Sequence, residues 1–489
     1  MSHLLRASCV AICDEQRTPA AHSQKLPRKG LPMQNRTMIA PLTGGLGHPF
    51  VQPPFDCTSV GYKQEEYLLS GDAARFHFVH GTGPSPDGEW QIRKGEVLPY
   101  RTRIVVRRPK DDSHFNGIVI LLWSNVSAGF DNIRTHPLMY EDGYVIVAAS
   151  VQRVGIEGFS GPNPKGLLAF DPERYRDLSI PTDDISFDIF SQIGEAIGPH
   201  RTGFLHPLGD LPVRQVIARG ASQSAARLAA YINAIAPLGH PFSGFMLDVY
   251  FGTPSAIDTN SDERPGNLND LSELIDGCCP AGTSRLRDID VPVFIINSET
   301  ETRSLAAVRQ PDNERFRLWE AAGIAHAGGI KVSAAFTATD LPPNNIDIQP
   351  FRDAALHWMR RWIEEGVPPP VQPRIEVEPA SGGIPPRIVR DKLGIARGGV
   401  RLPEVAVPTA VHTGFNTPDW AFLRGSSQPL TWEQLAALYD GPEDYLRRFS
   451  EAAEAAVEAG VLLPEGARTS IQRAREESPL NHTHREQNA

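Results

Sequence analysis

With 489 residues and a mass of 53.6 kDa, the chain is long enough to bury one large hydrophobic core or two ordinary ones. Hydrophobic residues make up 40% and charged residues 22%, as in a typical globular protein, while 42 Gly and 43 Pro indicate many turns and long connections. The formal net charge of -10 and the pI near 5.9 disfavour nucleic acids and anionic membranes as partners, because both bind to basic surfaces.

The N-terminal residues contain no motif that suggests a catalytic or binding role. Residues 1–13 include a short apolar patch, but Arg6 interrupts it and Asp14 and Glu15 follow, so we predict no signal peptide. Residues 1–40 are polar and contain Pro without a clear period, which favours an N-terminal arm or tail. No apolar run in the sequence approaches the length of a membrane span.

The five cysteines lack the paired spacing of a zinc site or a disulfide framework, which favours a reduced, cytoplasmic protein. Cys278 and Cys279 are adjacent and could form a vicinal disulfide, although two free thiols in a loop are the simpler interpretation. The cysteines are Cys9, Cys13, Cys57, Cys278 and Cys279.

Six short apolar runs, most of them rich in β-branched residues, predict strands, most of them buried on both faces. Helical patterns lie between several of these runs, for example Ala225, Leu228 and Ala229 at the spacing of one helix face. This alternation predicts an α/β fold with a mainly parallel sheet and helices on both faces. The runs are residues 103–106, 117–122, 144–149, 215–218, 244–247 and 291–296.

Two long segments interrupt the alternation. Residues 152–212 and 251–290 are rich in Gly, Pro, Asp and Ser and are too long for simple connections, so we predict insertions that form a lid or a pocket wall. Aromatic residues in or next to these segments are expected either to line that pocket or to pack the cores of the insertions. These residues are Phe159, Phe170, Phe187, Phe190 and Tyr250.

The predicted core spans residues 41–366. A Pro-rich stretch at residues 368–373 marks its end, and a helical pattern begins at Thr431. Residues 367–489 are therefore expected to form a C-terminal extension packed on the core.

The strongest motif is Gly-Ala-Ser-Gln-Ser at residues 220–224, directly after the strand 215–218 and before a helix. This context is typical of a nucleophile elbow with Ser222 as the nucleophile, because small residues let the chain reverse within a few residues. The alternative is that Ser222 only caps an ordinary helix. In an elbow, the amide of Gln223 at the start of the helix would face a developing oxyanion.

A second oxyanion donor is expected in the segment after the strand 117–122. Asn125 and Val126 lie there, and the backbone amide of either would serve, although an Asn in a turn is usually structural.

A serine nucleophile needs a base within hydrogen-bond reach and an acid that orients the base. His326 follows a short predicted strand at residues 316–320, and small neighbours leave room for its ring beside the serine. Glu299 and Glu301 follow the strand 291–296 and are candidates for the acid, with Asp248 as a third. We expect one of the two glutamates to be only a solvated loop charge.

Four segments together resemble a largely uncharacterised branch of α/β-hydrolase-domain proteins. They are Gly-Tyr-x-x-x-Glu-Tyr at 61–67, Asn-Val-Ser at 125–127, Gly-x-Ser-Gln-Ser at 220–224 and Gly-Gly-Val-Arg at 398–401. The resemblance implies the α/β-hydrolase fold and an esterase-like activity, and it accounts for Ser224 where the commoner elbow has Gly. In many α/β hydrolases the acid stands three residues after a Gly or another small residue that ends the strand, which here implies Glu301, counted from Ser298.

The predicted function is hydrolysis of a small ester or lactone by a Ser222–His326–Glu301 triad. No dinucleotide, P-loop or zinc motif occurs, so no cofactor or metal is expected. Two alternatives remain: an acyltransferase with the same triad, and a non-catalytic binding protein on the same fold. The sequence leaves homo-oligomer formation open.

Overall fold

The computed structural model describes residues 37–201, 206–258, 282–329, 339–382, 384–418 and 423–482. Within these residues the largest element is a nine-stranded sheet with the strand order β1-β2-β3-β5-β4-β6-β7-β8-β9. Its strands are β1 (Met38–Pro41), β2 (Tyr62–Phe78), β3 (Ile92–Pro109), β4 (Ile118–Trp123), β5 (Val145–Ala149), β6 (Gln215–Ala221), β7 (Gly244–Asp248), β8 (Val293–Ser298) and β9 (Phe316–Ala321).

The sheet is parallel over most of its width. β4 lies between β5 and β6 and pairs in parallel with both, and β7, β8 and β9 continue the parallel order beyond β6. β3 joins this part by antiparallel pairing with β5. Every residue of β4 and β5 is buried, as expected of strands that are covered on both faces. The predicted mainly parallel sheet is confirmed.

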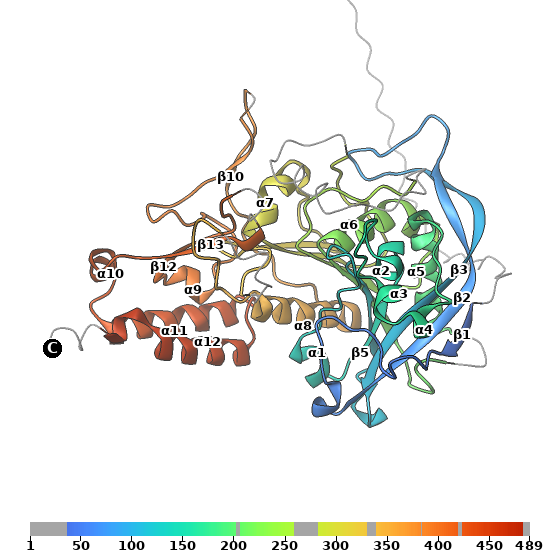
Figure 1. Ribbon diagram of the computed structural model, residues 1–489. Helices are drawn as coiled ribbons and strands as arrows, with labels where there is room; N and C mark the ends of the chain where they lie inside the picture. The colour runs from blue at the N-terminus through green and yellow to red at the C-terminus, as the bar shows by residue number, and fades with distance from the viewer. Residues whose placement is uncertain are drawn as a thin grey trace, which may run out of the picture. The chain divides into compact units, whose positions relative to one another are not determined.

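Helices cover both faces of the sheet (Figure 1). On one face, α5 (Ser186–Ile197) and α6 (Gln223–Ala230) share a hydrophobic core with Val119 and Leu121 of β4. On the other, α1 (Pro137–Glu141) and α8 (Gln349–Glu365) share a core with Ile118 and Ile120. Successive side chains of a strand point to opposite faces, so one strand contributes to both cores. The other helices before α8 are α2 (Arg153–Glu157), α3 (Leu167–Phe170), α4 (Pro172–Tyr175) and α7 (Glu299–Leu305).

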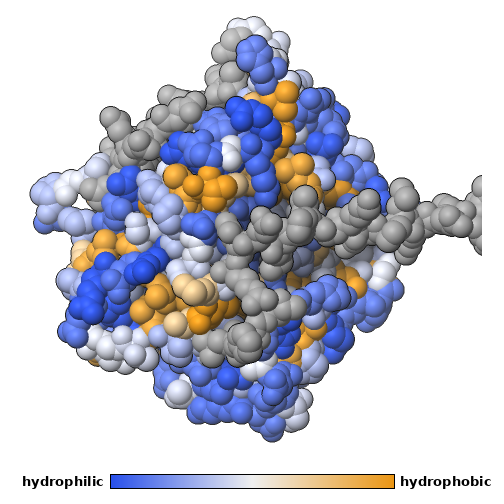
Figure 2. Space-filling view, turned by 90° about the vertical axis from the view of Figure 1, so that its right-hand side faces the viewer, coloured by the Kyte–Doolittle hydropathy of each residue, from blue (hydrophilic) through white to orange (hydrophobic). Residues whose placement is uncertain are grey.

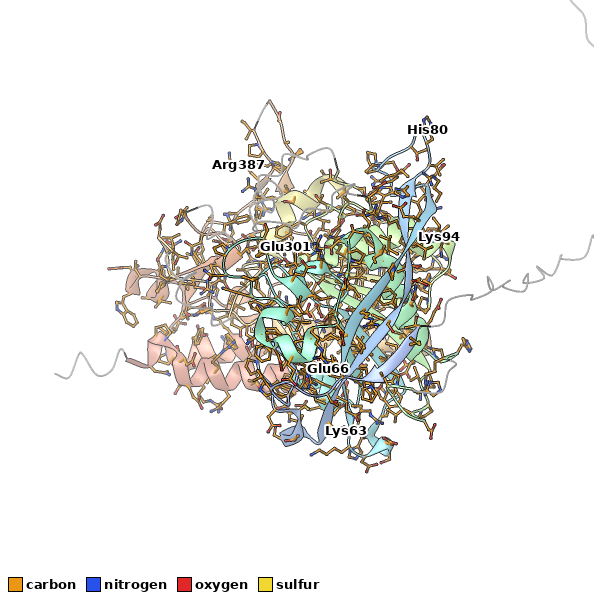
Figure 3. The ribbon with its side chains drawn as sticks, turned by 45° about the vertical axis from the view of Figure 1, so that its right-hand side comes forward. Lys63, Glu66, His80, Lys94, Glu301 and Arg387 are labelled. Atoms are coloured by element: carbon orange, nitrogen blue, oxygen red, sulfur yellow. The ribbon has the colours of Figure 1, made fainter. Side chains whose placement is uncertain are left out.

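β2 and β3 form a long antiparallel ribbon, of which the sequence revealed only residues 103–106. In Figure 3, Lys63 and Glu66 lie toward one end of the ribbon, and His80 and Lys94 lie toward the other. Figure 2 shows the side of the molecule on which β1, β2 and β3 lie, with several separate hydrophobic patches among hydrophilic residues. Such scattered apolar residues are ordinary for a protein surface.

A buried ion cluster joins the ribbon to its neighbours. Glu66 of β2 accepts hydrogen bonds from Arg103 of β3 at 2.5 Å and from Arg174 of α4 at 2.6 Å. Arg103 also lies 3.3 Å from Asp131, in the segment after β4. Burial raises the pKa of the Asp131 carboxyl. Because buried charges need partners, the residues at 61–67 help to fasten the segment after β4 to the sheet.

The chain after residue 366 shares a core with the sheet. Ile375, Val400 and Val461 belong to the same buried cluster as Trp319 of β9, and Val400 forms a parallel bridge with Ala321. Its helices are α9 (Pro403–Ala406), α10 (Trp432–Leu438), α11 (Pro442–Glu458) and α12 (Pro464–Glu477), and its antiparallel strand pairs are β10 (Val377–Glu378) with β11 (Arg387–Ile388) and β12 (Ala410–Thr413) with β13 (Ser426–Pro429).

The first predicted insertion contributes to the main core. α5 lies within residues 152–212, and its Phe187 and Phe190 pack against Trp123 of β4 with no exposed surface. They are core residues, because α5 presents its apolar face to the sheet. Of the two expected roles, core packing therefore holds for Phe187 and Phe190, and pocket lining does not. Phe170 packs edge-on against Phe50, and Phe159 is half-buried.

Some predictions fall partly outside the described residues. Of the expected arm at 1–40, residues 38–40 belong to β1, while 1–36 lie outside the description. The second expected insertion, 251–290, is described only at 251–258 and 282–290. Cys57 is a buried free thiol, and the other four cysteines lie outside the described residues.

Candidate active site

Ser222 stands between β6 and α6 in a strained backbone conformation, with φ 58° and ψ -120°. A positive φ is unusual for a residue with a side chain, and such strain is concentrated at functional positions. Gly220 makes the sharp turn feasible, because a Cβ atom there would lie 2.5 Å from the carbonyl oxygen of Ser224. The predicted strand, serine and helix therefore occur in the predicted order.

Ser224 locks this turn. Its hydroxyl accepts a hydrogen bond from the Ala221 amide at 2.8 Å and donates one to the Ala221 carbonyl at 2.9 Å. The side chain is buried, so both contacts are shielded from water. A glycine at this position would leave both backbone groups of Ala221 without these partners.

His326 lies in the segment after β9, with its side chain 11% exposed. Its Nδ1 lies 2.7 Å from Oε1 of Glu301, and its ring stacks on Phe251 at a centroid distance of 5.4 Å. Since β6, β8 and β9 run parallel, Ser222, Glu301 and His326 all follow the same edge of the sheet. Within the described residues, the Ser222 hydroxyl has no hydrogen bond to His326.

Glu301 is held in place by Ser298, the residue that caps α7. Its Oε2 accepts hydrogen bonds from the Ser298 amide at 2.8 Å and from the Ser298 hydroxyl at 2.7 Å. This capping box leaves Oε1 for His326, and the Glu301 side chain has no exposed surface. Figure 3 places Glu301 on α7, away from the β2–β3 ribbon.

Glu299 has different partners. Its Oε2 accepts a hydrogen bond from the Gly323 amide at 2.7 Å, and its Oε1 lies 2.8 Å from Arg390. The side chain is fully buried, so the expectation that one glutamate is a solvated loop charge was wrong. Both glutamates lie in the first turn of α7, where the helix dipole favours carboxylates.

Asp248, the third candidate acid, is engaged with Arg219 of β6. Its Oδ2 lies 2.8 Å from Nε and 2.6 Å from a terminal nitrogen of that guanidinium. Arg219 also lies 2.8 Å from Nε2 of His136, and burial lowers the pKa of His136. Because Arg can only donate, Nε2 of His136 is the acceptor and the ring is neutral. The Asp248 carbonyl accepts the Ser222 amide at 2.9 Å.

The segment after β4 contacts the elbow through Asn125. Its side-chain amide donates to the Ala221 carbonyl at 2.9 Å, and its side-chain oxygen accepts the Ser127 amide at 2.9 Å. The Asn125 side chain thus has the structural role that is usual for Asn in a turn. Val126 is buried beside it. The segment therefore lies next to the elbow, as expected of a loop that carries a second oxyanion donor.

Gln223 is fixed by a polar network that the sequence did not reveal. Gln152 accepts hydrogen bonds from Gln223 and from the Trp123 indole, both at 3.0 Å, and donates to Asp183 at 3.2 Å. Gln152 is buried, so its three contacts determine its orientation. Gln152 stands at the start of the predicted insertion 152–212, where nothing in the sequence distinguished it.

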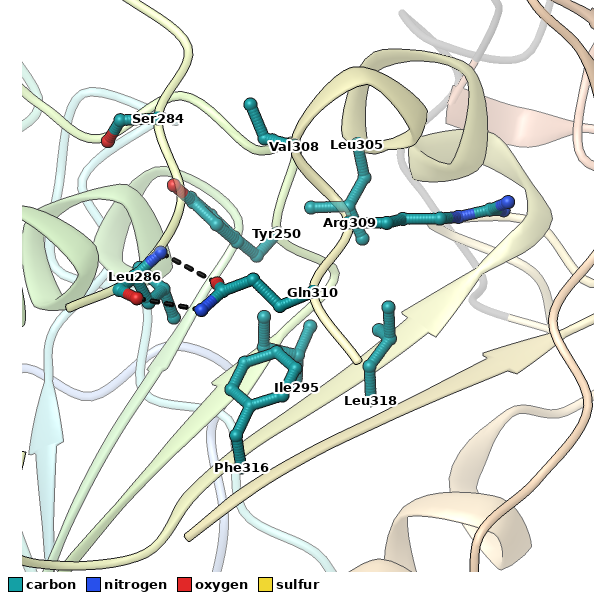
Figure 4. A pocket seen from close by; sticks show the side chains of 10 residues that line it. All are labelled: Tyr250, Ser284, Leu286, Ile295, Leu305, Val308, Arg309, Gln310, Phe316 and Leu318. Atoms are coloured by element: carbon teal, nitrogen blue, oxygen red, sulfur yellow. Dashed lines mark hydrogen bonds between the residues drawn. The ribbon is translucent and has the colours of Figure 1, made fainter. Parts of the chain in front are cut away.

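A small cavity lies against β8 and β9, beside α7 (Figure 4). Tyr250, Leu286 and Phe316 contribute to its walls, and Gln310 closes one side with two hydrogen bonds of 2.8 Å to the backbone of Leu286. The triad candidates are not among its lining residues. Tyr250 thus lines an internal cavity separate from the triad.

The described residues contain no group of three or more His, Cys, Asp or Glu side chains arranged to hold a metal ion. In the same part of the chain, no helix has both the length and the apolar character needed to cross a membrane.

Comparison with known proteins gives one extended match. Residues 34–472 match the family described as alpha/beta hydrolase domain. No curated protein matches the chain. Among solved structures, the esterase Est22 has a TM-score of 0.26 and 15% identity, with 54% of this chain and 72% of that chain covered. Oligopeptidase B from Leishmania major has a TM-score of 0.28 and 15% identity, with 55% and 33% covered. TM-scores this low support no inference about fold or substrate.

Proposed function

The chain belongs to the alpha/beta hydrolase domain family, and on this premise we propose that it is a serine hydrolase that cleaves a carboxylic ester or lactone through an acyl-enzyme on Ser222. The observation that carries the proposal is the 2.7 Å contact between Glu301 and His326, at the sheet edge where Ser222 stands in a strained turn. These residues supply a nucleophile, a base and an orienting acid in the order that the fold uses.

His326 activates the serine in this mechanism. A serine hydroxyl is a weak nucleophile, so Nε2 of His326 takes its proton while the oxygen attacks the ester carbonyl. Glu301 holds the proton of His326 on Nδ1 and stabilises the imidazolium that forms. The missing Ser222–His326 hydrogen bond is compatible with this role, because catalytic contacts often tighten only when substrate is bound.

Backbone amides stabilise the oxyanion of the tetrahedral intermediate. The Gln223 amide is in the first turn of α6, where helix amides have no partner within the helix. The amide of Asn125 or Val126 supplies the second donor. The imidazolium then protonates the leaving alkoxide, and a water molecule activated by His326 releases the acid from Ser222. The overall reaction converts an ester and water into an acid and an alcohol.

An ester or lactone fits this apparatus better than a peptide. An alkoxide leaving group requires only one proton from His326, whereas an amide also requires a closely placed acid and a cleft for an extended chain. We expect uncharged or weakly charged substrates of moderate size, with rates that depend little on added salt.

A fluorophosphonate probe tests the proposal directly. It should label Ser222, and Ser222→Ala should remove the label and lower ester turnover by about 10⁴-fold or more while the protein stays folded. Ser224→Ala removes the neighbouring hydroxyl and should keep the label on Ser222, at a lower yield because the turn loses its two hydrogen bonds to Ala221. A label that persists in Ser222→Ala, or that maps to Ser224, would exclude Ser222 as the nucleophile.

A panel of esters and lactones then identifies the substrate class. Product analysis with an added alcohol separates hydrolysis from acyl transfer. A folded protein that neither binds the probe nor cleaves any member of the panel would favour a non-catalytic binding protein.

A further inference from the structure

Three consecutive residues of α7 form hydrogen bonds to the segment that carries His326. The Glu299 amide donates to the Ile324 carbonyl at 2.9 Å, and its carboxylate accepts the Gly323 amide at 2.7 Å. The Thr300 hydroxyl accepts the His326 amide at 3.0 Å, and Glu301 contacts the His326 ring. Thr300 is therefore the residue of this turn that holds the backbone of His326 itself.

Thr300 also connects this segment to a distant part of the chain. Its hydroxyl donates to the carbonyl of Gly414, immediately after β12, at 2.7 Å. A hydroxyl has one proton, so donation to Gly414 leaves its lone pairs for the His326 amide. Thr300 is 1% exposed, and water cannot replace either contact.

The approach of β12 to α7 depends on glycine. A Cβ atom on Gly414 would lie 2.6 Å from the Thr300 amide nitrogen and 2.8 Å from Cβ of Glu299. Asn344 strengthens the same junction, because its side-chain amide donates to the carbonyls of Gly323 at 2.8 Å and Thr413 at 3.1 Å. The His326 segment is thus held from two sides, by α7 and by the chain around β12.

We propose that Thr300 is the positioning residue of His326. Through its hydrogen bond to Gly414, the chain after residue 366 helps to fix the position of His326 in the active site. The inference rests on the proposed function. Loss of the Thr300 hydroxyl would leave the His326 amide and the Gly414 carbonyl buried without partners. The backbone would shift to satisfy them, and displacement of a catalytic group by about 1 Å costs about 10²-fold in rate.

Three variants test this role. Thr300→Val keeps the shape and removes both hydrogen bonds, while Thr300→Ser keeps the hydroxyl. Thr302→Val is the matched control, because Thr302 is equally buried on α7 and, among the described residues, its hydroxyl bonds only to the Ser298 carbonyl at 3.5 Å. For each variant, kcat and KM for an ester that the wild type cleaves, the melting temperature and hydrogen exchange of the peptide 320–328 are measured.

Thr300→Val should lower kcat by about 10- to 100-fold with KM within about twofold of wild type. Thr300→Ser should restore most of the rate. Thr302→Val should keep kcat within about twofold even if its melting temperature falls as far. Equal kcat in the two valine variants, or no rescue by serine, would overturn the inference.

Hydrogen exchange separates failure of this inference from failure of the proposed function. Exchange in peptide 320–328 requires no substrate, and it should be faster in Thr300→Val than in Thr302→Val. An inactive, unlabelled wild type would refute the proposed function while this comparison still tests the grip on His326. Equal exchange in both variants would refute the grip.

Discussion

Glu299 and Glu301 are separated by one residue and are both fully buried, yet they hold different partners: Glu299 pairs with Arg390 and Gly323, whereas Glu301 contacts His326. The first turn of α7 thus combines a carboxylate that binds structural partners with one that faces the candidate base. Substitution of each should therefore affect a different property.

Glu301→Gln should lower kcat by about 10³- to 10⁴-fold, because the amide no longer selects the correct tautomer of His326. Glu299→Gln should instead lower the free energy of unfolding by about 2–4 kcal/mol, because it leaves Arg390 without its carboxylate. Esterase kinetics and urea unfolding measure the two effects. A greater loss of kcat in Glu299→Gln would transfer the acid role to Glu299, and near-normal activity in both variants would turn attention to Asp248.

Gly220→Ala should abolish probe labelling or prevent folding, since the new Cβ atom would lie 2.5 Å from the Ser224 carbonyl oxygen. Gly83→Ala is the matched control, because no atom lies within 4 Å of the corresponding position. Circular dichroism and labelling yield compare the two variants. A well-folded, fully labelled Gly220→Ala would show that the elbow tolerates more movement than its packing suggests.

Gln152→Leu should reduce both stability and kcat, because Gln223 and the Trp123 indole lose a buried acceptor at a cost of about 1–3 kcal/mol for each group. Gln192→Leu is a suitable comparison: Gln192 on α5 accepts a hydrogen bond from Tyr100 at 2.9 Å and is distant in sequence from the elbow. It should lower the melting temperature and leave kcat per folded molecule unchanged. Equal kcat losses would argue against a specific role for Gln152.

His412 should make the protein sensitive to mild acid. Burial lowers its pKa to about 4, below the value of about 6.5 for an unfolded chain. The unfolded state therefore binds the proton first, and the free energy of unfolding should fall by about 3 kcal/mol as the pH drops from about 6.5 to about 4. Unfolding by urea across this pH range should show a shallower decline for His412→Gln than for wild type. The exposed His80 provides the control, and an identical slope in His412→Gln would refute the assignment.

The sequence predicted the parts of the fold that depend on short apolar runs. β4, β5, β6, β7 and β8 are buried strands of mainly apolar residues, and their short continuous apolar runs distinguish them from the helices between them. The contact between His326 and Glu301 also agrees with their expected order. Their catalytic roles remain predictions.

Other features depend on contacts between distant residues. Apart from residues 103–106, the β2–β3 ribbon was not predicted, because its strands mix polar and apolar residues without strict alternation. Phe187 and Phe190 seemed free to line a pocket because the sequence does not show that α5 packs on Trp123. Thr300 lay unnoticed between two glutamates, because its importance arises from Gly414, over a hundred residues later.

The contact between Thr300 and Gly414 also sets an order of events during protein synthesis. Ribosomes add about 5–20 residues per second, so Thr300 and His326 are synthesised seconds before Gly414, whose carbonyl accepts the Thr300 hydroxyl. A nascent chain that stops before β12 would contain Ser222, Glu301 and His326 but lack Gly414, the residue that fixes the Thr300 hydroxyl. We therefore expect the newly made protein to remain inactive toward its substrate until the chain around β12 has been synthesised.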